Sequence, residues 1–201
     1  MYTLIGSPKT RAFRVLWMLE ELGLDYELIP DAPGGSAVAQ HNPSGKIPVL
    51  MDGDVAIPDS VAGMTYLADK HGHMTHPAGT KERALQDSFT NFLNDEFDSN
   101  LWTAARHRFA LPEDKRVPEI EASLKWEFER SGNTLEARLG DREYLTGDTP
   151  TVADMLLTHL SGWAHNFEFP KLPRPVIEVA RRMQSRDAFK RAHDIRKAPK
   201  G

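Results

Sequence analysis

The sequence contains no cysteine among its 201 residues. Disulfide bonds, thiolate metal sites and a catalytic thiol carried by the protein itself are therefore excluded. A chain without cysteine also fits a reducing compartment. At this length the chain forms one large domain or two small ones, and its core can be stable without covalent cross-links.

Long apolar runs are absent as well. No segment reaches the ~20 apolar residues that cross a membrane. The first apolar stretch carries Lys9, Arg11 and Arg14, which is unlike a secretory signal. We therefore expect a cytoplasmic protein with no membrane partner.

The chain also lacks a large excess of either charge. Its net charge of −4 gives no general attraction to nucleic acid. Residues 171–201 hold ten Lys or Arg against three acidic residues. A solvated terminal helix explains this better than a nucleic-acid patch. No nucleic-acid partner is expected.

The N-terminal part alternates between strand and helix patterns. The apolar run Tyr2–Gly6 is typical of a strand, and apolar residues spaced i, i+3, i+4, i+7 from Val15 predict a helix that ends near Gly23. A strand over residues 24–28 and a loop over 30–45 follow. Together with the next hairpin and helix, this predicts a compact α/β unit.

The hairpin is the most informative segment. An Asp-Gly pair between two apolar runs predicts strands that meet at Asp52. Pro48 holds Ile47 extended, so the peptide groups of Ile47 can pair with an extended peptide. Ser60 begins the next helix, whose N-terminal N–H groups favour an anion. The pattern favours a small, anionic, peptide-like ligand, although such a hairpin and helix can also bind nothing.

Beyond a linker marked by Pro77 and Gly79, nearly every pattern is helical. Apolar residues recur at helical spacing over 85–97, where Leu85 begins the stripe, and over 120–139. The segment from Thr151 to Asp154 has the form of a capping box. We therefore predict an α/β domain over 1–76 and an all-helical domain over 77–201.

Several motifs along the chain carry a family resemblance. They are Ser7-Pro8-x-Thr10-Arg11, Asn42-Pro43-x-Gly45-Lys46-Ile47-Pro48-Val49-Leu50, Asp59-Ser60, Tyr144-Leu145-x-Gly147 and Thr151-Val152-Ala153-Asp154. In this order and spacing the chain resembles the cytosolic glutathione S-transferases, in particular bacterial, serine-type members. The resemblance implies a thioredoxin-like, glutathione-binding domain over 1–76, an all-α substrate-binding domain over 77–201, and a homodimer.

The resemblance also implies a role for each matching residue of the first domain. Pro48 is expected to follow a cis peptide bond, and the backbone of Ile47 to pair with the cysteinyl unit of glutathione. Ser60 and its helix N-terminus are expected to take the γ-glutamyl carboxylate. Asp59 then neighbours the ammonium group, and Lys46 neighbours the glycyl carboxylate.

The implied reaction is attack of the glutathione thiolate on a small hydrophobic electrophile, with peroxide reduction as a possible side activity. A hydroxyl near the first helix would stabilise the thiolate. For this role Ser7 is favoured by its position, and Thr10 is the alternative. Either residue can instead serve only as a helix cap. Candidates for the electrophile pocket share one helix of the second domain: Trp102, Arg106, His107 and Phe109.

Two other functions stay open. The loop over residues 31–36 lacks the basic residues that many members of the family have there, and Pro58 is unusual at its position. These two departures favour a non-catalytic binding or interaction protein with the same fold. A glutathione-dependent isomerase needs the same thiolate as the transferase. Three histidines, His71, His73 and His76, fit no zinc motif. Glutathione as co-substrate, without a metal, is therefore the cofactor prediction.

Overall fold

The computed structural model describes residues 1–198. They form two compact units, one made of Met1–Pro77 with the residues from Gln184 onward, the other of Ala78–Met183. The predicted fold class, an α/β domain followed by helices, is confirmed. The second unit is shorter than the helical domain expected over 77–201, because the last helix packs with the first unit. Residues 199–201 of that range lie outside the described part.

The first unit is built around a four-stranded sheet with strand order β2-β1-β3-β4. Strand β1 is parallel to β2 and antiparallel to β3, and β3 is antiparallel to β4. The predicted hairpin and the predicted helix start at Ser60 are both confirmed. In chain order the elements are β1 (Tyr2–Ile5), α1 (Ala12–Leu22), β2 (Tyr26–Ile29), α2 (Ser36–Ala39), β3 (Val49–Asp52), β4 (Val55–Pro58) and α3 (Ser60–His71).

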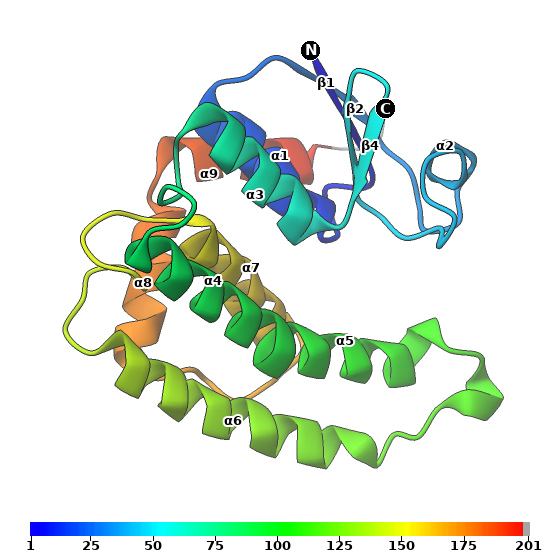
Figure 1. The fold of residues 1–201 in the computed structure, drawn as a ribbon. Helices are drawn as coiled ribbons and strands as arrows, with labels where there is room; N and C mark the ends of the chain where they lie inside the picture. Colours follow the sequence, from blue (N-terminus) through cyan, green and yellow to red (C-terminus); the bar gives the residue numbers. More distant parts are fainter. Residues whose placement is uncertain (199–201) are drawn as a thin grey trace. The chain divides into compact units, whose positions relative to one another are not determined.

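Helices α1 and α3 lie together against one face of this sheet (Figure 1). Eight consecutive residues of α1, from Ala12 to Leu19, are buried, so this helix is covered on every side. It ends at Gly23, which adopts the left-handed conformation predicted for a C-cap. On the other face, Val38 of α2 packs against Ile5 and Val49 in a small second core.

The C-terminal helix α9 (Asp187–Lys197) packs against α1 and completes its cover. The Phe189 ring lies edge-on to the rings of Phe13 and Trp17, with centroids 5.6 and 4.9 Å away. Arg191 also donates to the Glu20 carboxylate at 2.8 Å. Phe189 itself is half-buried, whereas Ala188 and Ala192 of the same helix are buried, so α9 is part of the first unit's core.

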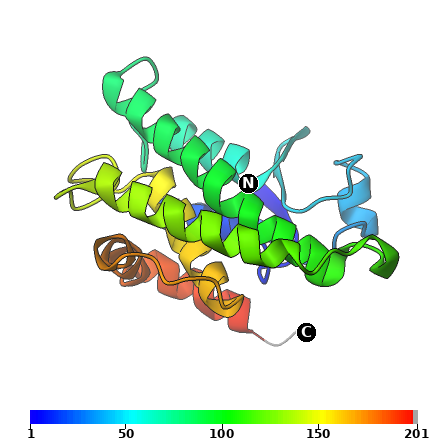
Figure 2. The same cartoon turned by 90° about the horizontal axis from the view of Figure 1, so that it is seen from below.

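The second unit is helical. Its first elements form one long bent rod, and α6 runs back beside it, joined by the segment between η2 and α6 (Figures 1 and 2). Its elements are α4 (Lys81–Leu93), the π-helical turn η1 (Asn94–Asp98), α5 (Ser99–Ala105), the π-helical turn η2 (Arg106–Ala110), the 3₁₀ turn η3 (Glu113–Lys115), α6 (Ile120–Leu139), α7 (Val152–Asn166) and α8 (Arg174–Gln184).

The core of the second unit follows the predicted apolar stripes with one exception. Phe97 and Phe128 are buried edge-on to each other, with ring centroids 4.9 Å apart. Leu85 was expected in the α4 stripe, but 38% of it is exposed because Gln86 occupies the buried face instead. The predicted capping box between Thr151 and Asp154 is present at the start of α7.

Candidate functional site

Three chain segments meet at one end of the four-stranded sheet. In the strand register, Ile5 lies opposite Val49, and Val49 lies opposite Pro58. The chain therefore leaves β1 toward Ser7, enters β3 from Ile47 and Pro48, and leaves β4 toward Asp59 and Ser60, all at the same end. The topology thus brings together the predicted site residues of the first domain.

Gly6 shows how closely two of these segments approach each other. A Cβ atom at this position would lie 3.1 Å from the Cβ of Ile47 and 3.4 Å from the Cα of Pro48. Gly6 also has a φ of 141°, which side chains rarely allow. A glycine is therefore required where the segment leading to Ser7 rests on the Ile47–Pro48 peptide.

The Ile47–Pro48 peptide bond is cis, as the resemblance implied. Pro48 is buried, and Ile47 is half-buried just before β3. Within residues 1–198, neither the N–H nor the C=O of Ile47 has a hydrogen-bond partner. Such an unpaired peptide can hydrogen-bond an extended ligand in the manner of an added strand.

Asn42 holds the loop that carries Lys46. Its buried side chain donates to the Lys46 carbonyl at 2.8 Å and accepts from the Ser44 N–H at 3.1 Å. The Gly45 carbonyl accepts from the Gly34 N–H at 2.8 Å. Lys46 itself is exposed. Its ammonium group is therefore carried by a fixed backbone.

The two candidate hydroxyls have different hydrogen-bond partners. The Thr10 hydroxyl donates to the Ser7 carbonyl at 2.7 Å and accepts from the Ala12 N–H at 3.2 Å. Its single proton is thus used inside the turn before α1. The Ser7 hydroxyl accepts from the Lys9 N–H at 3.3 Å, and within the described chain its proton has no acceptor. Ser7 is therefore the one free to donate to a ligand.

Asp59 is the N-cap of α3. Its carboxylate accepts from the N–H groups of Val61 at 2.8 Å and Ala62 at 3.1 Å. Ser60 is 1% exposed, and its Oγ accepts from the Arg14 guanidinium at 3.1 Å. The sequence interpretation gave the helix N-terminus to a ligand, whereas the carboxylate of Asp59 already occupies two of its N–H groups.

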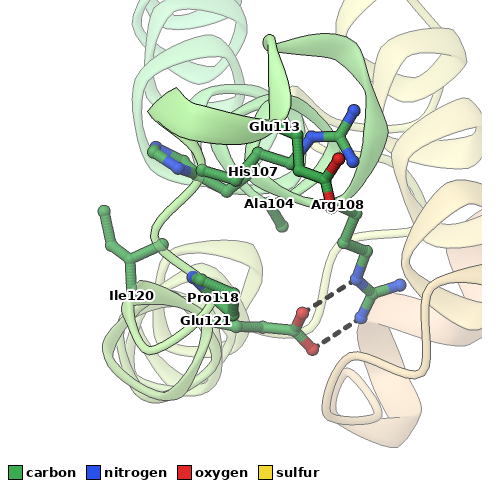
Figure 3. A pocket seen from close by; sticks show the side chains of 8 residues that line it. Ala104, His107, Arg108, Glu113, Pro118, Ile120 and Glu121 are labelled. Atoms are coloured by element: carbon green, nitrogen blue, oxygen red, sulfur yellow. Dashed lines mark hydrogen bonds and ion pairs between the residues drawn. The ribbon is translucent and has the colours of Figure 1, made fainter.

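The four candidates for the electrophile pocket lie in the second unit. His107 lines a cavity of about 420 Å³ between η2 and the start of α6, with the Arg108–Glu121 ion pair on its wall (Figure 3). Trp102, Arg106 and Phe109 are not among its lining residues. Phe109 is 60% exposed, and its ring lies edge-on to Phe167. Of the four predicted pocket residues, only His107 therefore lines this cavity.

Sequence comparison identifies the family. Residues 10–70 match the family model of the glutathione S-transferase N-terminal domain. The chain is 31% identical over 166 residues to the probable glutathione S-transferase GSTF2 of Oryza sativa, covering 74% of this chain and 73% of that protein. The chain belongs to the glutathione S-transferase family.

Solved structures of other glutathione transferases have the same fold. The URE2P6 enzyme of Phanerochaete chrysosporium, crystallised with oxidised glutathione, superimposes with a TM-score of 0.83 at 26% identity, covering 97% of this chain and 96% of that one. A glutathione transferase of Methylococcus capsulatus gives a TM-score of 0.84 at 25% identity, with 98% of each chain covered. The predicted thioredoxin-like and all-α architecture is therefore that of the family.

For this glutathione S-transferase, the sequence interpretation missed two supporting residues. Asn42 was noted only as part of a motif, although the Asn-Pro-Ser-Gly run is a strong turn signal. Arg14 was counted only as a charge in the first helix, and nothing local indicated its contact with Ser60, 46 positions away. No described helix has the length and hydropathy of a membrane span.

Proposed function

We propose that this glutathione S-transferase conjugates the glutathione thiolate to small hydrophobic electrophiles. The observation that carries this proposal is the unpaired peptide of Ile47 beside the cis bond to Pro48. It offers one donor and one acceptor with which an extended peptide can pair. Family membership supports glutathione as that peptide.

The Ser7 hydroxyl is the proposed stabiliser of the thiolate. A thiol with a pKa of ~8.5 is only a few per cent ionised at pH 7, and lowering this pKa by ~1.5 units takes ~2 kcal/mol. A hydrogen bond to a charged group supplies ~1.5–3 kcal/mol. One hydroxyl whose proton is free, as in Ser7, is therefore sufficient without a metal or a general base.

The remaining contacts follow the charges of the ligand. Lys46 is proposed to face the glycyl carboxylate, since it is exposed and its backbone is fixed by Asn42. Asp59 is proposed to face the ammonium of the γ-glutamyl group, because its carboxylate is exposed at the start of α3. Ser60 is proposed to take the carboxylate of that same group.

The electrophile is proposed to contact the second unit through Trp102, Arg106, His107 and Phe109. Arg106 Nε is the one buried side-chain polar atom in residues 1–198 without a hydrogen-bond partner. Buried donors are rarely left unpaired, so an electrophile with an acceptor atom, such as a nitro or carbonyl oxygen, would satisfy it. A peroxide is a second proposed substrate: two glutathione molecules reduce it to an alcohol and water and are themselves oxidised to glutathione disulfide.

Thiolate formation is the direct test. Glutathione is titrated into the protein at pH 7 while the ultraviolet absorbance of the thiolate is measured. We expect saturable absorbance corresponding to about half ionisation. Saturable binding without thiolate absorbance would favour a non-catalytic binding protein, and no binding by a folded protein would reject glutathione as its ligand.

Two variants then distinguish the role of the Ser7 hydroxyl from that of the Thr10 hydroxyl. Ser7→Ala is expected to raise the pKa of bound glutathione by about one unit and to lower kcat/KM below pH 7 by roughly ten-fold. Thr10→Val removes a turn hydrogen bond and is expected to cost ~1 kcal/mol of stability with the thiol pKa unchanged. If both variants keep the wild-type pH profile, the hydroxyl mechanism is wrong.

A glutathione-dependent isomerase remains the second candidate, because it uses the same thiolate. Release of an isomerised product with no net loss of glutathione, under conditions in which chlorodinitrobenzene is not conjugated, would favour it. For either activity we propose a cytoplasmic homodimer, as is usual in the family. Sedimentation of the purified protein tests the dimer.

A further inference from the structure

Two arginine side chains lie over one buried aromatic ring of the second unit. The guanidinium carbon of Arg138 is 4.2 Å from the ring centroid of Phe89, and that of Arg142 is 5.8 Å from the same centroid. Phe89 is 1% exposed. Arg138 also lies over the ring of Phe92, at 4.8 Å. Two cations are therefore held close together against an apolar surface.

This arrangement is unfavourable for the protein by itself. Burial and the neighbouring charge of Arg142 both lower the pKa of Arg138. The ring contacts are attractive to a cation, but they supply no counter-charge. Within residues 1–198, no carboxylate forms an ion pair with either guanidinium group. An anion from outside the chain would remove the repulsion between the two cations.

Other arginines from α6 to α8 do have acidic partners. These pairs are Arg130 with Glu96, Arg181 with Glu178, and Arg182 with Glu143. The missing carboxylate is thus particular to Arg138 and Arg142 and is not a general property of this surface.

Hydrogen-bond donors are left over at the same place. Arg138 Nη2 donates to Ser88 Oγ at 2.9 Å. Arg142 donates from Nε to the Leu145 carbonyl at 3.1 Å and from Nη2 to the Arg138 carbonyl. Within the described chain, the other N–H groups of the two guanidinium groups and the Ser88 hydroxyl proton have no acceptor. The three side chains therefore offer donors to a ligand from two helices and a turn.

This set of donors matches a tetrahedral oxyanion. Guanidinium groups bind phosphate oxygens through paired N–H···O bonds, and a dianion neutralises two cations at once. Ser88 and Arg142 are exposed, so an anion can reach them from solvent. We propose that Ser88, Arg138 and Arg142 form a binding site for a phosphate dianion, either free or as a monoester. The site lies within the second unit, and its ligand is independent of glutathione.

Calorimetric titration with inorganic phosphate at pH 7.5 tests the site, without glutathione and at constant ionic strength. We expect a Kd on the order of 1 mM for the wild type. In 20 mM phosphate the Tm is expected to be about 4 °C higher than in chloride of the same ionic strength. Phenyl phosphate is titrated in the same way. Tighter binding than that of phosphate assigns the site to a monoester, and equal or weaker binding assigns it to the free anion.

Three substitutions remove the proposed contacts one at a time. Arg138→Gln and Arg142→Gln are each expected to weaken phosphate binding at least ten-fold, because each loses a charge-assisted contact. Ser88→Ala loses a neutral donor and is expected to weaken binding about three-fold. Arg138→Lys keeps the charge without the paired donors, so its affinity is expected to lie between those of Arg138→Gln and the wild type.

The matched control is Arg130→Gln, two turns earlier on α6. Arg130 lies over the ring of Trp126 at 5.3 Å and has Glu96 as its acidic partner. This variant is expected to bind phosphate as the wild type does. A general stabilisation of the fold by phosphate would raise the Tm of every variant alike. If Arg138→Gln does not fold, Arg142→Gln and Ser88→Ala carry the test.

Two results overturn the inference. One is a wild-type protein that shows no saturable binding up to 20 mM phosphate, and the other is wild-type affinity in all three substitutions. If wild-type protein binds no phosphate and its dimer dissociates in Arg138→Gln, the two cations instead face a carboxylate of a second copy. Since no measurement uses glutathione, failure of this site leaves the proposed transferase activity untouched.

Discussion

Asp59 both stabilises and strains the start of α3. Its carboxylate accepts two hydrogen bonds as the N-cap, and such caps contribute ~1 kcal/mol. Its backbone, however, has a φ of 82° and a ψ of 133°. A non-glycine residue in such a conformation costs ~1–3 kcal/mol. Strain of this kind is typical of functional sites.

Two substitutions of Asp59 separate its cap from its strain. Asp59→Ala loses the cap and keeps the strained backbone, so we expect it to unfold about 1 kcal/mol more easily than the wild type. Asp59→Gly loses the same cap but accepts a positive φ freely. We expect it to be at least 1 kcal/mol more stable than Asp59→Ala in urea unfolding. Equal stabilities for the two would contradict the strain argument.

Most residues of the candidate site could be named from the sequence, but two of their contacts could not. Strand order fixes where Ile47 and Ser60 lie, because β1, β3 and β4 meet at one end of the sheet. The Ser7 and Thr10 hydroxyls became distinguishable only through their hydrogen bonds. Arg14 escaped notice because a contact across 46 positions leaves no local pattern.

Among the elements, α9 is the one whose place the sequence did not predict. Its amphipathic pattern predicts a helix, but apolar periodicity does not say which surface that helix covers. The structure adds the missing partner. Arg186, just before α9, donates to the Glu21 carboxylate, whose side chain is 4% exposed, and Glu21 also accepts from the Trp17 indole at 3.2 Å. The ion pair and the aromatic contacts bind α9 to α1.

We predict that the Arg186–Glu21 pair holds α9 in place. Arg186→Ala leaves the Glu21 carboxylate buried without its cation, and breaking a buried pair costs ~3–5 kcal/mol. Because Arg186 is 31% exposed, water offsets part of this cost. We expect a loss of ~2 kcal/mol in the free energy of unfolding, measured by urea titration.

The control for this prediction is Lys190→Ala on the same helix. Lys190 pairs with Asp187 at 2.8 Å, and both side chains are mostly exposed. Exposed pairs contribute ~0–1 kcal/mol, so this variant should stay within ~0.5 kcal/mol of the wild type. Similar losses for Arg186→Ala and Lys190→Ala would show that α9 is not held by the buried carboxylate.

For the whole molecule, the absence of cysteine and the proposed thiol chemistry are consistent with each other. The sulfur is carried by a ligand, and the protein supplies an open peptide, a hydroxyl and fixed charges. None of these groups is oxidised in the reaction. The overall stability of the chain then depends on ordinary packing and on its few buried charges, of which Asp154 in the second unit is fully buried.

The burial of Asp154 predicts how the stability of the protein changes with pH. Burial raises its pKa to about 6, even though Leu145 N–H, Thr151 N–H and the Thr151 hydroxyl donate to the carboxylate. The unfolded carboxyl ionises near pH 4. Between these values the folded state holds a proton that the unfolded state releases, so stability falls as pH rises. The loss is complete above pH 6 and amounts to ~3 kcal/mol.

The measurement compares urea unfolding of the wild type and Asp154→Asn across this pH range. Asn does not titrate, so other groups contribute equally to both proteins. We expect the stability advantage of the wild type to be larger at pH 4 than at pH 7, by roughly the 3 kcal/mol that two pKa units represent. An advantage that grows toward pH 7 would mean that the three donors outweigh desolvation and that the ionised carboxylate is the form that caps α7.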